Sequence, residues 1–193
     1  MSRELLPSFP LRAARVHEAC GPAATTFAVI TAARTPGNIL WIYEGWLPAT
    51  LHPPALVAFF DPARLLLARA GSQADSLAVA EEALKDGAVG LVVIEVANAL
   101  DLREGRRLQL AARAGGGTGL CLIPEGMGSN AAETRWRVAP VPGEGDSTLM
   151  RWEIIKNKLG TTGTWHVRWD EQAHRLHVVS PAGEQPGSAG LPD

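Results

Sequence analysis

An acidic residue ends a strongly apolar segment near the middle of the chain. The segment Gly87 to Ile94 has the composition of a buried strand in a parallel sheet, and Glu95 follows it directly. A carboxylate at the carboxyl end of such a strand can organise a magnesium ion beside bound phosphates. Glu44, after an earlier apolar run, could activate a water molecule. Alternatively, Glu95 is a polar strand end that is hydrogen-bonded to neighbouring loop amides.

A phosphate site of this kind also needs a glycine-rich loop that ends in Lys-Ser or Lys-Thr. The lysine neutralises the β- and γ-phosphates, and the hydroxyl group binds the metal. The loop in the corresponding place is short, because only two alanines separate Gly21 and Pro22 from Thr25 and Thr26. The loop contains no lysine, and the first lysine of the chain is Lys85.

The missing lysine makes the candidate nucleotide site degenerate. If the loop is aligned without a gap, Phe27 stands where the lysine belongs, and an aromatic ring there would repel a triphosphate. Losing the lysine leaves negative charges unpaired near a buried site. Arg34 is the one nearby cation that could substitute, and it lies far along the predicted helix. Two interpretations stay open: a plain strand–turn–helix connection, or a remnant that binds nucleotide weakly through Gly21, Thr25, Thr26 and Glu95.

A second group of candidate residues lies late in the chain. The segment 151–160 places a tryptophan among basic residues, and Trp and Arg are favoured anchors of interfaces. This segment could contact a DNA backbone or a partner protein. Alternatively, it is a solvated hairpin with one buried tryptophan. The candidate contact residues are Arg151, Trp152, Lys156, Asn157 and Lys158.

Composition argues against several other classes of function. The 193 residues carry a formal net charge of -2, so the whole molecule does not attract nucleic acid electrostatically. The five histidines do not have the spacing of a metal site, and Cys20 and Cys121 lie in apolar stretches typical of buried free thiols. No window approaches the roughly 20 apolar residues of a membrane span. The N-terminus is too short and too charged for a secretory signal. We therefore expect a cytoplasmic protein that uses no metal and no cofactor.

Two different sequence periods predict the fold. Up to Pro124, apolar runs alternate with amphipathic segments, which predicts a parallel sheet covered by helices. After Pro124, polar and apolar residues alternate with the period of half-exposed antiparallel strands. The predicted class is α/β: a mixed β-sheet with a parallel core flanked by helices, followed by antiparallel C-terminal strands. Expected strands are 15–20, 39–42, 65–67, 87–95, 118–123, 134–138, 150–155, 164–169 and 175–179, and expected helices are 25–34, 55–60, 72–84 and 101–114.

The same reading divides the chain into three parts. Residues 1–14 form a short N-terminal leader, and residues 15–180 form one core domain. Residues 181–193 are rich in Pro, Gly, Ser and Ala and cannot build a hydrophobic core, so we expect a disordered tail.

The ordered chain from about residue 15 to 179 resembles the RecA core, and most closely the ImuA family of RecA-like proteins in the bacterial DNA-damage response. The loop 21–26 is similar to a shortened RecA phosphate loop. The stretch 76–100 is similar to a RecA helix and acidic strand, with Glu95 where RecA has an aspartate. Ile155 to Lys158 is similar to the late RecA strand that ends in Lys-Asn-Lys, while 130–136 and 52–54 resemble ImuA itself.

Three departures from RecA accompany this resemblance. The lysine of the phosphate loop is missing. Pro124 to Gly128 stands where RecA has a glutamine switch and a long DNA-binding loop. The helix and strand that RecA uses for polymerisation are not recognisable in residues 1–14. ATP-driven filament formation and strand exchange are therefore not expected.

The resemblance implies a catalytically degenerate accessory or adaptor protein, not an enzyme, in the SOS response. Its role would be damage-induced, error-prone translesion synthesis (mutagenesis). The implied partners are an ImuB-like relative of Y-family polymerases and an alternative C-family replicative polymerase, with RecA or DNA as further candidates. Two alternatives stay open: a residual RecA-type ATPase that uses Thr25, Thr26 and Glu95, and a cell-division inhibitor of the SulA type.

Overall fold

The computed structural model describes residues 6, 8–45, 51–142, 148–160 and 162–181. In chain order its elements are β1 (Val16–Cys20), α1 (Ala24–Arg34), β2 (Ile39–Glu44), α2 (Pro53–Leu56), a 3-10 turn (Pro62–Arg64), β3 (Leu65–Ala70), α3 (Gln73–Asp86), β4 (Leu91–Glu95), α4 (Leu102–Gly115), β5 (Thr118–Leu122), β6 (Thr134–Pro140), β7 (Leu149–Asn157), β8 (Gly163–Asp170) and β9 (Arg175–Pro181). These strands form one sheet in the order β3-β2-β4-β5-β1-β6-β7-β8-β9. Pairing is parallel from β3 to β6 and antiparallel from β6 to β9. The predicted fold class is confirmed.

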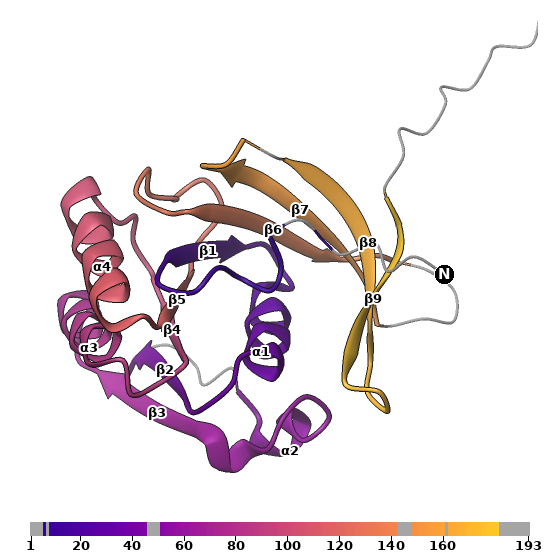
Figure 1. The fold of residues 1–193 in the computed structure, drawn as a ribbon, viewed down its shortest axis with the longest axis horizontal. Coiled ribbons are helices and arrows are strands. Elements are labelled where there is room, and N and C mark those ends of the chain that lie inside the picture. The colour runs from indigo at the N-terminus through magenta and orange to yellow at the C-terminus, as the bar shows by residue number, and fades with distance from the viewer. Residues whose placement is uncertain (1–5, 7, 46–50, 143–147, 161, 182–193) are drawn as a thin grey trace, which may run out of the picture.

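Helices cover both faces of the parallel half of the sheet. Helices α3 and α4 lie side by side on one face, and α1 lies on the other face, where the antiparallel strands curve around it (Figure 1). Two hydrophobic clusters follow this division. One joins α3 and α4 to the sheet, and the other joins α1 to both the parallel strands and strands β6 to β8. The sheet therefore separates two hydrophobic cores, one on each of its faces.

Local sequence signals fix the ends of α3 and α4. Ser72 caps α3 by accepting a hydrogen bond from the amide of Asp75, and Gly87 ends the helix with a φ of 75°. Asp101 and Glu104 form a reciprocal capping box at the start of α4, and Gly116 ends that helix with a φ of 80°. Such caps satisfy amides and carbonyls that the helix itself leaves unpaired. The helix boundaries expected from the sequence are confirmed here.

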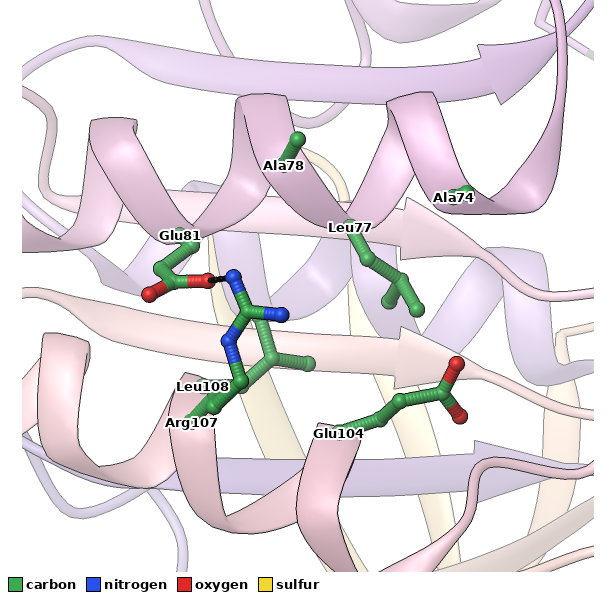
Figure 2. A pocket seen from close by; sticks show the side chains of 7 residues that line it. All are labelled: Ala74, Leu77, Ala78, Glu81, Glu104, Arg107 and Leu108. Carbon is green, nitrogen blue, oxygen red and sulfur yellow. Dashed lines mark ion pairs between the residues drawn. The ribbon is translucent and has the colours of Figure 1, made fainter.

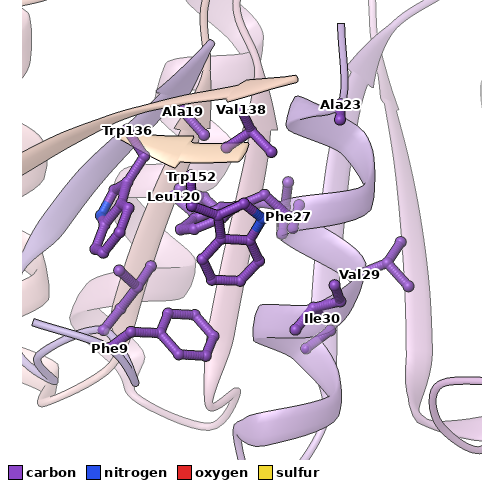
Figure 3. Packing of buried hydrophobic residues seen from close by; sticks show 14 of the residues in the cluster. Phe9, Ala19, Ala23, Phe27, Val29, Ile30, Leu120, Trp136, Val138 and Trp152 are labelled. Atoms are coloured by element: carbon purple, nitrogen blue, oxygen red, sulfur yellow. The ribbon is translucent and has the colours of Figure 1, made fainter. Parts of the chain in front are cut away.

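An aromatic cluster dominates the core beneath α1. Phe27 is fully buried, and its ring centroid lies 4.6 Å from that of Trp152 and 5.3 Å from that of Trp136. Phe9 completes the cluster at 5.8 Å from Phe27 (Figure 3). The expectation that Phe27 would stand in the phosphate position is therefore wrong. Its side chain points into the core, where it packs α1 against the antiparallel strands.

The predicted leader is only partly separate from the core. Leu6, Phe9 and Leu11 are buried and belong to the α1-side cluster. Phe9 also packs edge-on against Trp152, with ring centroids 5.0 Å apart. Residues of the predicted leader therefore contribute to the core, and their burial had no signal in the sequence because these hydrophobic residues show no clear period.

Strand β1 carries two buried polar residues, of which His17 has both ring nitrogens occupied. Its Nε2 lies 2.9 Å from the carbonyl oxygen of Arg12, which can only accept, so Nε2 carries the hydrogen. Its Nδ1 lies 2.7 Å from the hydroxyl of Thr134 and accepts from it, while the same Thr134 oxygen accepts from Trp136 Nε1 at 2.9 Å. The neutral imidazole thus satisfies every bond, and burial lowers the pKa of His17 to about 4.

Two elements differ from those expected. The helix expected over 55–60 is instead a single turn at Pro53–Leu56, and it starts earlier than expected because proline favours the first turn of a helix. Strand β9 runs to Pro181, and the predicted disordered tail otherwise lies outside the described residues.

None of the helices that the structure describes combines the length and apolar character of a membrane span.

The aromatic cluster predicts a large loss of stability on truncation. Phe27→Ala should lower the free energy of unfolding by about 3–5 kcal/mol, because it leaves a cavity between two tryptophans. Thr26→Ala, at the neighbouring and partly exposed position, should change it by less than about 0.5 kcal/mol. Urea unfolding followed by tryptophan fluorescence measures both values. Equal effects of the two substitutions would contradict the packing role of Phe27.

The buried imidazole predicts a pH dependence with a definite sign. The folded-state pKa of His17 is about 4, below its ordinary value of 6.5. Between these values the unfolded chain binds a proton that the folded protein does not. The free energy of unfolding should therefore fall as the pH is lowered from about 6.5 to about 4, by on the order of 3 kcal/mol in total. An NMR titration of the His17 ring, assigned with His17→Gln, checks this. A ring that titrates near its ordinary pKa would refute it.

Candidate functional site

The turn between β1 and α1 packs tightly against β6. Gly21 has a φ of 95°, and a Cβ atom placed on it would lie 2.5 Å from the carbonyl oxygen of Val138. The amide of Ala23 donates to the same carbonyl at 3.1 Å, and the amide of Ala24 donates to the carbonyl of Gly21 at 3.1 Å. A phosphate loop needs successive amides that point at the ligand. In this turn two amides are already used within the protein, which matches the geometry of a plain strand–turn–helix connection.

Thr25 and Glu95 line one open depression at the carboxyl edge of the parallel sheet. The depression has a volume of about 380 Å³, and its other lining residues are Val96, Ala97, Leu122, Ile123 and Pro124. Two of the four predicted nucleotide-site residues are thus brought together, whereas Gly21 and Thr26 do not line this space. As far as the chain is described, no basic side chain lines it either. The arrangement offers one carboxylate and one hydroxyl on an apolar floor.

The carboxylate of Glu95 is held in place by a neighbouring strand. Trp41 on β2 donates its indole N–H to Glu95 Oε1 at 2.7 Å. Glu44, at the end of β2, is buried and is not part of the depression. Within the described residues, no cluster of three or more His, Cys, Asp or Glu side chains could hold a metal ion. Glu95 therefore has the orientation of an acidic strand end without a metal-binding set around it.

Arg34 lies at the wrong end of α1 to replace the missing lysine. It is the last of the 11 residues of that helix. At 1.5 Å per residue, its backbone stands about 15 Å along the helix axis from the turn. The positive charge that a triphosphate needs is therefore not supplied from α1.

The two late lysines bind backbone within the protein. Lys156 Nζ donates to the carbonyl oxygens of Ser129, Asn130 and Ala132 at 3.2, 2.8 and 2.9 Å. Lys158 Nζ donates to the carbonyl of Ala131 at 2.7 Å. Burial lowers the pKa of Lys156. Both ammonium groups stabilise the loop that precedes β6, which is a structural role.

The other candidate contact residues divide between core and surface. Trp152 is fully buried beside Phe27, so its inclusion in a contact surface was wrong. Asn157 donates to the hydroxyl of Ser8 at 3.2 Å. Arg151 is 51% exposed and pairs with Glu153 at 3.1 Å. Of the predicted set, Arg151 alone presents a largely exposed charge outside the loop contacts. The inward position of Trp152 follows from its alternation with Met150 and Ile154, a signal present in the sequence.

Sequence reasoning missed the buried ion pair that anchors this loop. Glu18, only 1% exposed, accepts from Arg135 Nε at 2.7 Å and from the amide of Ser129 at 2.8 Å. Arg135 also donates to the carbonyl of Ser129 at 2.9 Å. Glu18 lies directly opposite Arg135 in the pairing of β1 with β6. A glutamate inside a strand of buried residues was the available signal for this pair.

Comparisons with known proteins agree with the fold and with the resemblance. No family model matches the chain. Protein ImuA of Caulobacter vibrioides (strain NA1000 / CB15N) is 34% identical over 163 residues, covering 75% of this chain and 65% of that protein. Protein ImuA of strain ATCC 19089 / CIP 103742 / CB 15 gives the same values. The chain thus spans about 65% of the length of these curated relatives.

A solved structure supports the architecture independently. The crystal structure of the RadB recombinase superposes with a TM-score of 0.64 over 83% of this chain and 90% of that one, at 15% identity. At that identity the likeness shows the fold alone. Together with the sequence match, it agrees with the resemblance: the chain is similar in sequence to Protein ImuA and has a RecA-like fold.

Proposed function

We propose that this protein acts in damage-induced, error-prone translesion synthesis as a RecA-like accessory protein without ATPase activity. It would work in the cytoplasm through protein partners. The partners proposed are an ImuB-like relative of Y-family polymerases and an alternative C-family replicative polymerase. RecA and DNA are further candidates for direct contact.

One observation carries the non-catalytic part of the proposal. The β1–α1 turn lies against the carbonyl of Val138, no basic side chain among the described residues lines the adjacent depression, and Phe27 fills the core below. Phosphoryl transfer depends almost entirely on positioning and on charge neutralisation of the phosphates. A turn that provides neither would leave a bound triphosphate with unpaired charge. This supports the proposal of an adaptor in which the RecA-like fold serves to present surfaces to partner proteins.

A residual nucleotide-binding protein is the second candidate. The observation in its favour is that Thr25 and Glu95 share one depression at the edge of the sheet, where functional groups of parallel α/β proteins gather. Against it stands the absence of a basic residue from that lining among the described residues. A nucleotide titration separates the two candidates.

The nucleotide titration should give a negative result. Wild-type protein with Mg²⁺-ATP should show no micromolar affinity by isothermal calorimetry, and Glu95→Ala should behave identically. The physical reason is that, among the described residues, no basic side chain lines the depression to neutralise the β- and γ-phosphates. Micromolar binding that Glu95→Ala abolishes would favour the residual ATPase.

A co-purification experiment tests the adaptor role. The wild-type protein, expressed together with the ImuB-like protein encoded in the same genome, should be retained with it on an affinity column. Retention should persist in Glu95→Ala, because the proposed contact needs no nucleotide. Loss of retention with both proteins folded would remove the support for this role. Inhibition of tubulin-like filament assembly by the purified protein would instead favour the SulA-type alternative.

A further inference from the structure

The outer face of α4 carries three arginines that have no partner in the described part of the chain. Arg103, Arg106 and Arg113 are all exposed, and they form no hydrogen bond or ion pair with any residue that the structure describes. At 100° per residue they lie within roughly 80° of one another around the helix, and they span about 15 Å along its axis. Uncompensated positive charge is therefore concentrated on one side of one helix, in a chain whose formal net charge is -2.

Two leucines interrupt this row of arginines on the same face. Leu110 is 65% exposed and Leu102 is 46% exposed. Both fall within the same arc of roughly 100° as the arginines. Arginines with interspersed apolar side chains are the composition of a protein interface, in which arginine is enriched and lysine is depleted.

A shallow groove beside this face separates α4 from α3. Its floor is apolar, with Ala74, Leu77 and Leu108 (Figure 2). Arg107 of α4 crosses the groove to form an ion pair with Glu81 of α3. Arg107 is thereby neutralised within the protein, which sets it apart from the three unpaired arginines.

The neighbouring helix carries the opposite charge. Asp75, Glu82 and Asp86 are exposed on α3, and they outnumber the one exposed cation of that helix, Lys85. A long polyanion that crossed both helices would be repelled by these carboxylates, since like charges brought together cost free energy. A single acidic helix that lay along α4 alone would meet only the arginines and the leucines. The face also has no aromatic side chain on which a base could stack.

We infer that the outer face of α4 binds an acidic amphipathic helix of a partner protein. Glutamates or aspartates of that helix pair with Arg103, Arg106 and Arg113, and its apolar residues cover Leu102 and Leu110. This inference rests on the proposed function only in that the protein acts through partners. It adds the surface and the chemistry of the segment that occupies it.

The decisive experiment uses a synthetic helical peptide with glutamates and leucines along one face. Fluorescence anisotropy should show binding to wild-type protein that weakens with added salt. Arg106→Glu combined with Arg113→Glu should weaken binding by about tenfold or more, because attraction becomes repulsion. The neutral pair Arg106→Gln with Arg113→Gln should give a smaller loss in the same direction. Thermal unfolding of each variant establishes that it is folded.

A matched control comes from two exposed arginines elsewhere. Arg34→Glu with Arg175→Glu changes the net charge by the same amount, and Arg34, like Arg113, lies in the last turn of its helix. This pair should bind the peptide as well as wild-type protein does. A peptide of the same composition with its glutamates scattered around the helix should bind neither protein. If this control variant lost as much affinity for the peptide as the double variant Arg106→Glu with Arg113→Glu, the binding would not be specific to α4 and the inference would fail.

The apolar part of the surface has its own test. Leu110→Ser should weaken the peptide complex about threefold to tenfold without changing its salt dependence, because it removes buried apolar area and no charge. Leu159→Ser, at a leucine that is 69% exposed outside α4, should have no effect. An unchanged affinity in Leu110→Ser would contradict the proposed helix.

Two further measurements separate this inference from its rivals. The first measurement is binding of double-stranded DNA. If DNA binds wild-type protein, the double variant Arg106→Glu with Arg113→Glu does not bind it, and the peptide binds neither protein, the face is a phosphate surface and the inference is overturned. If the peptide binds α4 but the ImuB-like protein is not retained by wild-type protein, the surface stands and the proposed function falls. If wild-type protein and the double variant Arg106→Glu with Arg113→Glu retain the partner equally, and the peptide does not bind, the proposed function stands and the inferred binding surface on α4 is refuted.

Discussion

The packing of Phe27 between two buried tryptophans fixes the first turn of α1 to the antiparallel strands. Its ring centroid lies 4.6 Å from Trp152 and 5.3 Å from Trp136, and all three side chains are fully buried. Because core packing tolerates little displacement, the turn that precedes the helix has almost no freedom to move. Gly21 therefore lies against Val138, and the amide of Ala23 bonds to that strand. The closed turn follows from the core beneath it.

The parallel half of the fold could be predicted because its signals are local. Ser72, Asp101 and Gly87 mark helix ends by chemistry that acts within one turn of the chain. The burial of Phe27 could not be predicted in this way, because it depends on Trp136 and Trp152, more than 100 residues away in the sequence. A gapless alignment to a phosphate loop placed Phe27 at the position of the lysine, beside the phosphates. In the structure, tertiary packing instead directs its ring into the core. The same limit applies to Leu6, Phe9 and Leu11, whose burial depends on strands formed much later in the chain.

The candidate contact residues show how charge in a sequence differs from charge on a surface. Lys156 and Lys158 stand in a basic segment, yet their ammonium groups bind four carbonyl oxygens of residues 129–132. These carbonyls belong to a loop without regular pairing, and unpaired buried carbonyls are costly. Glu18 and Arg135 bind the same loop from β1 and β6. The sequence shows the charges but not the loop to which the two lysines donate. The alternation of polar and apolar residues in β7 therefore predicted which side chains are buried better than its basic composition predicted a contact surface.

The missing lysine also has a consequence for the protein without ligand. A helix N-terminus already carries partial positive charge from its unpaired amides, and a nearby ammonium group adds repulsion unless an anion is bound. A working phosphate loop accepts this repulsion because nucleotide binding offsets it. In the present turn, the amides of Ala23 and Ala24 bond to carbonyls of the protein, and no side-chain cation lies in the first turn of α1. The RecA-like sheet is thus stabilised by contacts that need no nucleotide.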